Sequence, residues 1–166
     1  MSRESVDNMN YPTQVQNEIK EYFGNDFYRY FIFLMTYSRW RDDLKRRELW
    51  TESVQRYMDF MKENLGDKLT DDEYIEVHNA ILNQEVMPSM RLLWSSGAAC
   101  RRTNVTAYNC SFIAPTKLED FGEILYNLTC GCGVGFSVER HVISNLPFIN
   151  EQTGESLMSG MGELHL

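Results

Sequence analysis

Four cysteines are the side chains of this 166-residue sequence with the clearest capacity for chemistry: Cys100, Cys110, Cys130 and Cys132. They do not form the two C-x-x-C pairs of a zinc ribbon, and neither His78 nor His165 has a second ligand at helical spacing, so we expect no metal site. A disulfide between Cys130 and Cys132 would be strained, so we expect free thiols. Taken alone, a single cysteine on a strand is most often a small buried apolar residue.

A glycine-rich run, Gly131-Cys132-Gly133-Val134-Gly135, directly follows Cys130 and contains Cys132. Loops that bind dinucleotides or phosphates follow a strand and open a helix. Here a helix precedes the glycines and a strand follows them, so we reject that function. The glycines instead indicate close approach of a neighbouring backbone or of a ligand, and their spacing alone favours tight backbone packing.

Two predicted strands and one helix position these residues. The pattern of residues 108–114 predicts a strand that carries Cys110, and that of residues 134–138 predicts a second strand. Between them, a capping box over residues 116–119 opens a helix with an apolar stripe at Phe121, Ile124, Leu125 and Leu128. The connection is long enough for a right-handed parallel crossover. If the strands are parallel neighbours, Cys110 faces bare glycine backbone.

The preceding part of the chain predicts helices. One opens at Thr13, with Gln16 as its capping-box partner, and ends at Gly24; a second starts at residues 25–26 and runs to about Trp40. Thr51 is the predicted cap of a third helix and Thr70 that of a fourth, with Glu73 in its first turn. Residues 39–47 are basic and are interpreted as a solvated connector, and the chain becomes irregular from Pro88. The apolar stripes of the four helices are Val15, Ile19, Tyr22 and Phe23; Phe27, Tyr30, Phe31, Leu34 and Met35; Val54, Tyr57, Met58, Met61 and Leu65; and Tyr74, Val77, Ile81 and Leu82.

Composition excludes several classes of protein. Hydrophobic residues make up 43% and charged residues 24%, which supports a packed core. The formal net charge of -8 argues against a partner bound through nucleic-acid phosphates. No apolar run approaches the roughly 20 residues of a membrane span, and the N-terminus lacks the core of a signal peptide. We therefore expect a cytoplasmic protein with neither a membrane nor a nucleic acid as partner.

The ordered motifs resemble the start of the catalytic barrel of ribonucleotide reductases. They are Met87-Pro88-Ser89-Met90-Arg91-Leu92-Leu93-Trp94-Ser95-Ser96-Gly97, Arg101-Arg102-Thr103, Tyr108-Asn109-Cys110-Ser111-Phe112 and Gly131-Cys132-Gly133-Val134-Gly135-Phe136-Ser137-Val138. The sequence is most similar to the monomeric, adenosylcobalamin-dependent class that reduces ribonucleoside triphosphates. Residues 13–85, including Tyr37-Ser38-Arg39-Trp40, also resemble the N-terminal region of that class, and the whole match covers about residues 10–150.

The resemblance implies a role for each matched position. Cys110 corresponds to a strand cysteine that supplies one of two reducing thiols and ends in a disulfide with a partner cysteine. Ser89 corresponds to a loop position that contacts the substrate, and Ser111 lies beside Cys110. The glycine-rich turn lines the substrate pocket in the family; its members here are Gly131, Gly133 and Gly135, together with Cys132, which replaces the commoner glycine and narrows the floor.

The fold implied is mainly α with a short α/β part: a helical region at 1–86, then the first strand–helix–strand of an incomplete reductase-type α/β barrel at 87–150. Residues 151–166 form a foreign-looking tail that resembles a segment of elongation factor G. The family's radical-bearing cysteine, second redox cysteine and most of its cobalamin-contacting surface lie beyond the match. Adenosylcobalamin, a thioredoxin-type reductant and the remaining reductase chain are therefore expectations for a complete enzyme.

Three alternatives remain open from the sequence, and one of them is a truncated product with no function. The chain could be a non-catalytic binding or scaffold module derived from the helical region. It could also be part of the large subunit of a diiron-dependent reductase, although the short N-terminus leaves no room for the nucleotide-binding cone usual there. On any of these readings, an isolated strand–helix–strand piece leaves open sheet edges, so we expect it to self-associate or to bind another chain.

Overall fold

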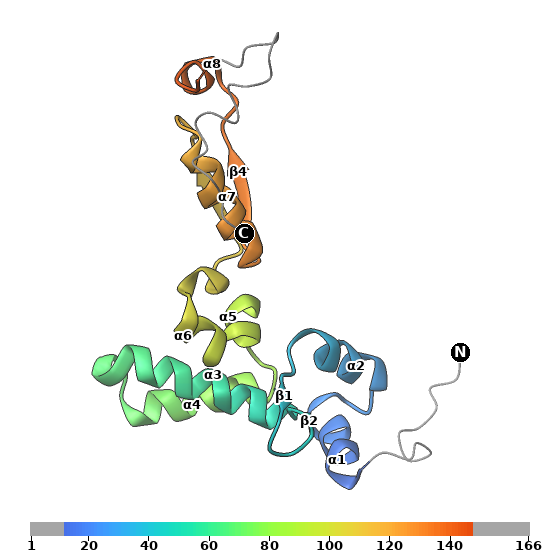
Figure 1. Ribbon diagram of the computed structural model, residues 1–166. Coiled ribbons are helices and arrows are strands. Elements are labelled where there is room, and N and C mark those ends of the chain that lie inside the picture. The colour runs from blue at the N-terminus through green and yellow to red at the C-terminus, as the bar shows by residue number, and fades with distance from the viewer. Residues whose placement is uncertain (1–11, 148–166) are drawn as a thin grey trace. The chain divides into compact units, whose positions relative to one another are not determined.

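The computed structural model describes residues 12–147, and the chain divides into two compact units between Ala107 and Tyr108 (Figure 1). The described residues are mostly helical with a few short strands, which confirms the expected balance of secondary structure. Residues 87–107, which the sequence groups with the later part of the chain, lie in the first unit. The expectations for the tail at 151–166 fall outside the described residues.

The first unit consists of helices and one short hairpin. Its elements are α1 (Thr13–Tyr22), α2 (Phe27–Thr36), β1 (Trp40–Arg41), β2 (Arg46–Arg47), α3 (Trp50–Leu65), a 3-10 turn (Gly66–Lys68), α4 (Asp71–Leu82), α5 (Met90–Ser95), α6 (Ala98–Arg102) and a second 3-10 turn (Asn104–Ala107). The strands β1 and β2 are antiparallel, with Trp40 opposite Arg47. No helix among the described residues is long and apolar enough to cross a membrane.

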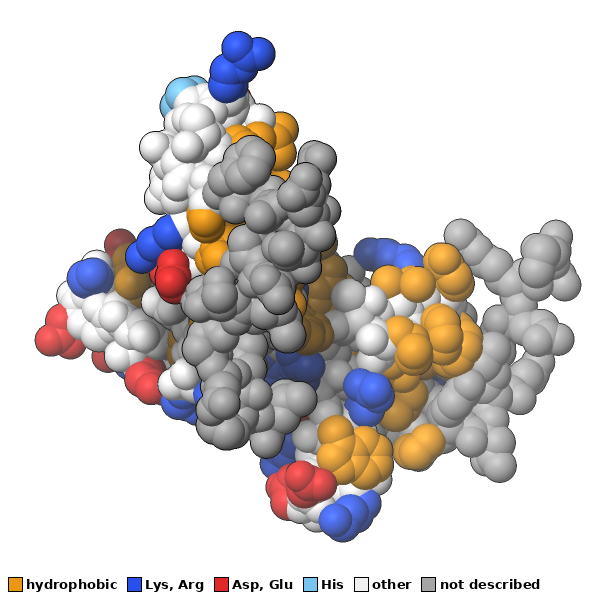
Figure 2. Space-filling model, turned by 45° about the horizontal axis from the view of Figure 1, so that its top comes forward, with side chains coloured by type: hydrophobic (Ala, Val, Ile, Leu, Met, Phe, Trp, Pro, Cys, Tyr) orange, Lys and Arg blue, Asp and Glu red, His pale blue; other side chains and the backbone are white. Residues whose placement is uncertain are grey.

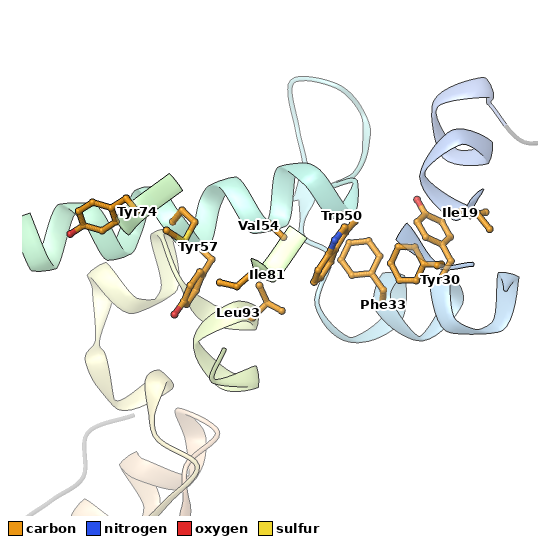
Figure 3. Close-up of a cluster of buried hydrophobic side chains, with 11 residues drawn as sticks. Ile19, Tyr30, Phe33, Trp50, Val54, Tyr57, Tyr74, Ile81 and Leu93 are labelled. Carbon is orange, nitrogen blue, oxygen red and sulfur yellow. The ribbon is translucent and has the colours of Figure 1, made fainter. Parts of the chain in front are cut away.

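A continuous apolar core lies inside the first unit (Figure 3). Its buried members are Ile19, Phe23, Tyr30, Phe33, Trp50, Val54, Tyr57, Met58, Tyr74, Ile81 and Leu93. The rings of Phe33 and Trp50 meet edge to face, with centroids 5.5 Å apart. Each fully buried large side chain contributes roughly 1.5–3 kcal/mol. The first unit therefore has a hydrophobic core of its own, built from five helices.

The second helix differs from its prediction in length and in its buried face. It ends at Thr36, and Trp40 lies in β1. Phe33 is buried, whereas Phe31 is 44% and Met35 62% exposed. Because the segment is apolar on every side, its pattern could not select the face that meets the core.

Four helix starts test the predicted starts and caps. The predicted start at residues 25–26 and the predicted cap at Thr70 are confirmed: Asp26 accepts from the N–H groups of two residues of α2, and Thr70 forms its capping box with Glu73. Thr51 is not the cap of α3, because the helix already begins at Trp50. Glu18 of α1 is buried there instead, and its carboxylate accepts from the backbone N–H of Trp50 at 2.8 Å and that of Thr51 at 3.1 Å. Thr13 likewise lies inside α1, after Pro12.

The basic segment forms a hairpin whose guanidinium groups are paired within the chain. Arg46 contacts Glu52 at 2.7 Å and Arg41 contacts Asp43 at 2.7 Å. Arg39 stacks on the ring of Trp94 at 4.0 Å from its centroid. The segment is therefore more ordered than a solvated connector.

A buried ion pair joins the hairpin, α3 and the turn after α5. Glu48 and Arg56 have side chains only 5% and 17% exposed, and Nε of Arg56 lies 2.9 Å from the carboxylate. Arg56 also donates to the carbonyl oxygen of Ser96 at 3.0 Å and to its hydroxyl at 2.9 Å. Residues 88–107, expected to be irregular, thus form two short helices and a 3-10 turn that are held against α3.

The second unit contains β3 (Cys110–Ile113), α7 (Glu119–Thr129), β4 (Gly133–Phe136) and α8 (Arg140–Ile143). The predicted strand–helix–strand order is confirmed. The predicted capping box at Thr116 is wrong: Leu118 precedes the helix, and Asp120 accepts from the N–H of Thr116 at 2.8 Å and from that of Lys117 at 3.2 Å. These hydrogen bonds hold the pKa of Asp120 below its usual value.

Candidate functional site

The two strands of the second unit form a parallel pair. Cys110 is the register partner of Gly133, and Phe112 is that of Gly135. At the start of the strand pair, the N–H of Gly133 donates to the carbonyl oxygen of Asn109 at 2.9 Å. This hydrogen bond fixes the register. The pairing of the cysteine strand with the glycine strand, on which the sequence argument depends, is confirmed.

The two faces of this sheet differ in their exposure. Side chains alternate between the faces of a strand, so Cys110 and Phe112 leave one face and Ser111 and Ile113 leave the other. Cys110 is exposed and Phe112 is 68% exposed, whereas Ser111 and Ile113 are half-buried. This alternation indicates that α7, which packs against both strands, covers the face of Ser111. The thiol of Cys110 is on the open face.

Glycine keeps space free beside that thiol. A methyl group added at Gly133 would find the carbonyl oxygen of Asn109 at 3.5 Å as its nearest neighbour, and one added at Gly135 would meet the ring of Phe112 at 3.6 Å. Adjacent strands lie about 4.8 Å apart, so Cys110 has a neighbour without a side chain at that distance. The open face therefore offers a thiol, a bare stretch of backbone and one aromatic wall.

Gly131 has a structural reason for being glycine. It has a φ of 83° at the end of α7. Its N–H donates to Leu128 at 2.9 Å, and that of Cys132 donates to Asn127 at 3.0 Å. This pair of hydrogen bonds is a Schellman motif, which requires the left-handed conformation that glycine adopts without strain. The motif ends the helix and directs the chain into β4.

The other predicted site residues have different surroundings. Cys132 is 2% exposed, so its side chain is already enclosed by the second unit, and its Sγ lies 3.6 Å from the carbonyl oxygen of Gly133. Ser111 donates to that same oxygen at 3.5 Å, from the face opposite to Cys110. Ser89 lies in the first unit, where its hydroxyl caps α5 by accepting from the N–H of Leu92 at 3.3 Å.

All four cysteines are free thiols, as expected. Cys100 is buried in the first unit, with its sulfur 3.1 Å from the hydroxyl of Ser95. Within residues 12–147, no three metal-ligating side chains come together. Phe112 was missed as a residue of the open face, although its position two residues after Cys110 carried that information.

No family model matches the sequence. The chain is 26% identical over 170 residues to an adenosylcobalamin-dependent ribonucleoside-triphosphate reductase of Lactobacillus gasseri, a match that covers 84% of this chain. It is also similar to a solved B12-dependent class II ribonucleotide reductase, with a TM-score of 0.59 and 25% identity over 82% of this chain. The chain spans 23% of the first relative and 25% of the second. The resemblance recognised in the motifs is therefore confirmed by sequence and by fold.

Proposed function

We propose that this chain supplies the first strand–helix–strand of the catalytic barrel of an adenosylcobalamin-dependent ribonucleotide reductase, and that Cys110 is one of its two reducing thiols. The observation that carries the proposal is the register of Cys110 with Gly133 on the open face of the β3–β4 pair. The similarity to cobalamin-dependent reductases over more than four-fifths of the chain supports the reaction class. It also favours this class over the diiron-dependent reductases.

The proposed reaction replaces the 2′-hydroxyl of a ribonucleoside triphosphate by hydrogen. Two thiols give up two electrons and two protons, a disulfide forms between them, and the hydroxyl oxygen leaves as water. Cys110 provides one thiol from the open face, and the second comes from the rest of the enzyme. A thioredoxin-type reductant then restores both thiols by exchange with that disulfide. In the cytoplasm, where we place the enzyme, thiols are kept reduced.

The glycines of β4 leave space for a substrate beside the thiol of Cys110. In this proposal the ribose lies over Gly133 and Gly135, where no side chain keeps it from the backbone. Gly131 shapes the turn that precedes them, and Cys132 and Ser111 support the strand pair from its covered side. For Ser89 the contact with the substrate is carried over from the motif resemblance alone; within the first unit its hydroxyl caps α5. Phe112, beside Gly135, forms one wall.

When bound, adenosylcobalamin supplies the radical that starts the reaction in the complete enzyme. The described residues do not fit this cofactor. A hollow of about 550 Å³ in the first unit is open and lies between α3 and α4, with Asp59, Lys62 and Asp71 on its wall. Because this hollow is open and lies between two surface helices, it does not suit cobalamin, and we assign the cofactor to parts of the enzyme other than residues 12–147.

A reconstitution assay tests the proposal. The 166-residue chain is combined with L. gasseri reductase lacking the 170-residue region that this chain matches, together with adenosylcobalamin, a dithiol and a ribonucleoside triphosphate. We expect deoxyribonucleotide to form with the wild-type chain and with Cys130→Ser, and only background with Cys110→Ser. Equal turnover by the Cys110→Ser and wild-type chains would show that this thiol is not a reductant.

A non-catalytic module is the second candidate, and the separate core of the first unit favours it. A module of that kind needs the helices but not the thiol. It predicts that Cys110→Ser changes neither the stability of the chain nor any complex that the chain forms, and that no combination of polypeptides containing this chain yields deoxyribonucleotide.

A further inference from the structure

The helix between the two strands has an apolar stripe that its own sheet does not cover. Phe121, Ile124, Leu125 and Leu128 recur at helical spacing along α7. Ile124 is 7% exposed, whereas Phe121 is 43%, Leu125 62% and Leu128 49% exposed. Figure 2 shows hydrophobic side chains, in orange, at the surface of the chain. The second unit therefore buries one residue of the stripe and leaves three open.

The width of the sheet explains this exposure. Two strands lie about 4.8 Å apart, whereas a helix with its side chains is about 10 Å across. Ile124 faces the strand pair, and Leu125, one residue on, leaves the helix at about 100° from it. A stripe of this width fits a sheet that continues beyond two strands. In the described part of the chain, β3 and β4 pair only with each other.

Open strand edges strengthen the argument. Unpaired backbone N–H and C=O groups at an edge are a template for another strand, and an isolated two-stranded sheet is marginally stable in water. Exposed apolar residues continue past α7, with Phe136 at 50% and Val138 at 68% exposure. A strand added at an edge, with the helix that follows it, would cover both the edge and the stripe.

We infer that Phe121, Leu125 and Leu128, together with the free edges of β3 and β4, form a docking surface for the remaining barrel of the reductase. This inference rests on the proposed function and names its partner surface. The partner that would bind this surface is indicated by how much of each relative the chain matches. The chain matches 23–25% of two reductases, so about three-quarters of their length is available to continue this sheet. A net charge of -8 disfavours a second copy of this chain as the occupant.

A binding experiment with matched variants tests the docking surface. The probe is again the L. gasseri reductase that lacks the matched region, titrated with the 166-residue chain and followed by calorimetry. We expect binding by the wild type and about tenfold or greater weakening by Leu125→Glu, because a leucine buried on docking is replaced by a charge. Ile75→Glu is the control: Ile75 is 59% exposed on α4 of the first unit, and its substitution should leave the affinity unchanged.

Other outcomes overturn the inference. Equal weakening by both variants, or none by Leu125→Glu in a chain whose circular dichroism is unchanged, rules out the surface on α7. Absence of binding by the wild type to a probe that circular dichroism shows to be folded rules out the barrel remainder as occupant, and so does a homodimer that Leu125→Glu dissociates. Failure of the proposed function looks different: the complex forms, Leu125→Glu weakens it, Cys110→Ser binds as the wild type does, and no deoxyribonucleotide appears.

Discussion

Replacing Arg56 by methionine should destabilise the first unit more than any surface charge substitution. The guanidinium donates from Nε and Nη2 to Glu48, whose side chain is 5% exposed. Without Arg56, the carboxylate keeps the backbone N–H of Arg39 at 3.2 Å and the hydroxyl of Ser53 at 2.9 Å but loses its only cationic partner among these contacts. Removing one member of a buried pair typically costs about 3–5 kcal/mol.

The turn after α5 adds to this cost. Arg56→Met leaves the carbonyl oxygen of Ser96 without the donor that lies 3.0 Å away. We therefore expect a loss in the upper half of that range, about 4–5 kcal/mol. The double variant Glu48→Leu/Arg56→Met removes the unpaired charge and should recover part of the loss, although the donors from Arg39 and Ser53 then lose their acceptor.

Urea unfolding followed by tryptophan fluorescence isolates the relevant unit. Trp40, Trp50 and Trp94 are all the tryptophans of the chain, and all three lie in the first unit. Arg101→Met is the matched control, because Arg101 pairs with Glu63 while 53% exposed, and an exposed pair contributes about 0–1 kcal/mol. A loss below about 1 kcal/mol for Arg56→Met, or one no larger than the control, would refute the assignment of a buried, uncompensated carboxylate.

Two further predictions concern pH and backbone conformation. The Arg46 guanidinium holds the pKa of Glu52 below its usual value of 4.5, with a further contribution from the N–H of Leu49. A carboxylate whose pKa is lowered by folding stabilises the folded state above pH 4.5, and this stability is lost as the pH falls through the folded-state pKa. The urea midpoint should therefore drop on acidification below pH 4.5. The Glu52→Gln variant should show a smaller drop. Just after α7, Gly131→Ala should cost about 1–2 kcal/mol because of the positive φ at that position. Within α7, Gly122→Ala, with nothing within 4 Å, should stabilise the helix by up to about 1 kcal/mol; hydrogen exchange of the α7 amides measures both changes.

Local signals in the sequence were sufficient to predict where a helix starts when the capping residue is close in the chain to the N–H groups that it caps. Asp26 and Thr70 cap helices through N–H groups two and three residues away, and these caps were predictable. The cap of α3 was not, because Glu18 reaches its N–H groups from a helix 32 residues earlier. Long-range capping of this kind follows no spacing rule in the sequence. The prediction of Thr51 as the cap used local spacing alone and was therefore wrong.

The candidate site shows the same division. Strand, helix and strand in order, with a helix of sufficient length, made parallel pairing predictable. The register that places Cys110 beside Gly133 was not predictable from the pattern, because sliding one strand by two residues would leave the same faces exposed. The motif resemblance pointed to both residues, but the hydrogen bonds from Gly133 to Asn109 and from Ser137 to Ile113 show which pairs are neighbours.

The open position of Cys110 and the exposed stripe of α7 both belong to a sheet that, within residues 12–147, has two strands. A reacting thiol has to be held within fractions of an ångström of its substrate, which two strands with free edges do poorly. A third strand would pair with one edge, extend the cover under Leu125 and restrict the motion of β3. In this proposal, the docking of the remaining barrel is therefore also the event that positions Cys110. A substitution at Leu125, on the far side of the sheet from the thiol, should therefore lower turnover in the reconstituted enzyme even at concentrations where the complex is saturated.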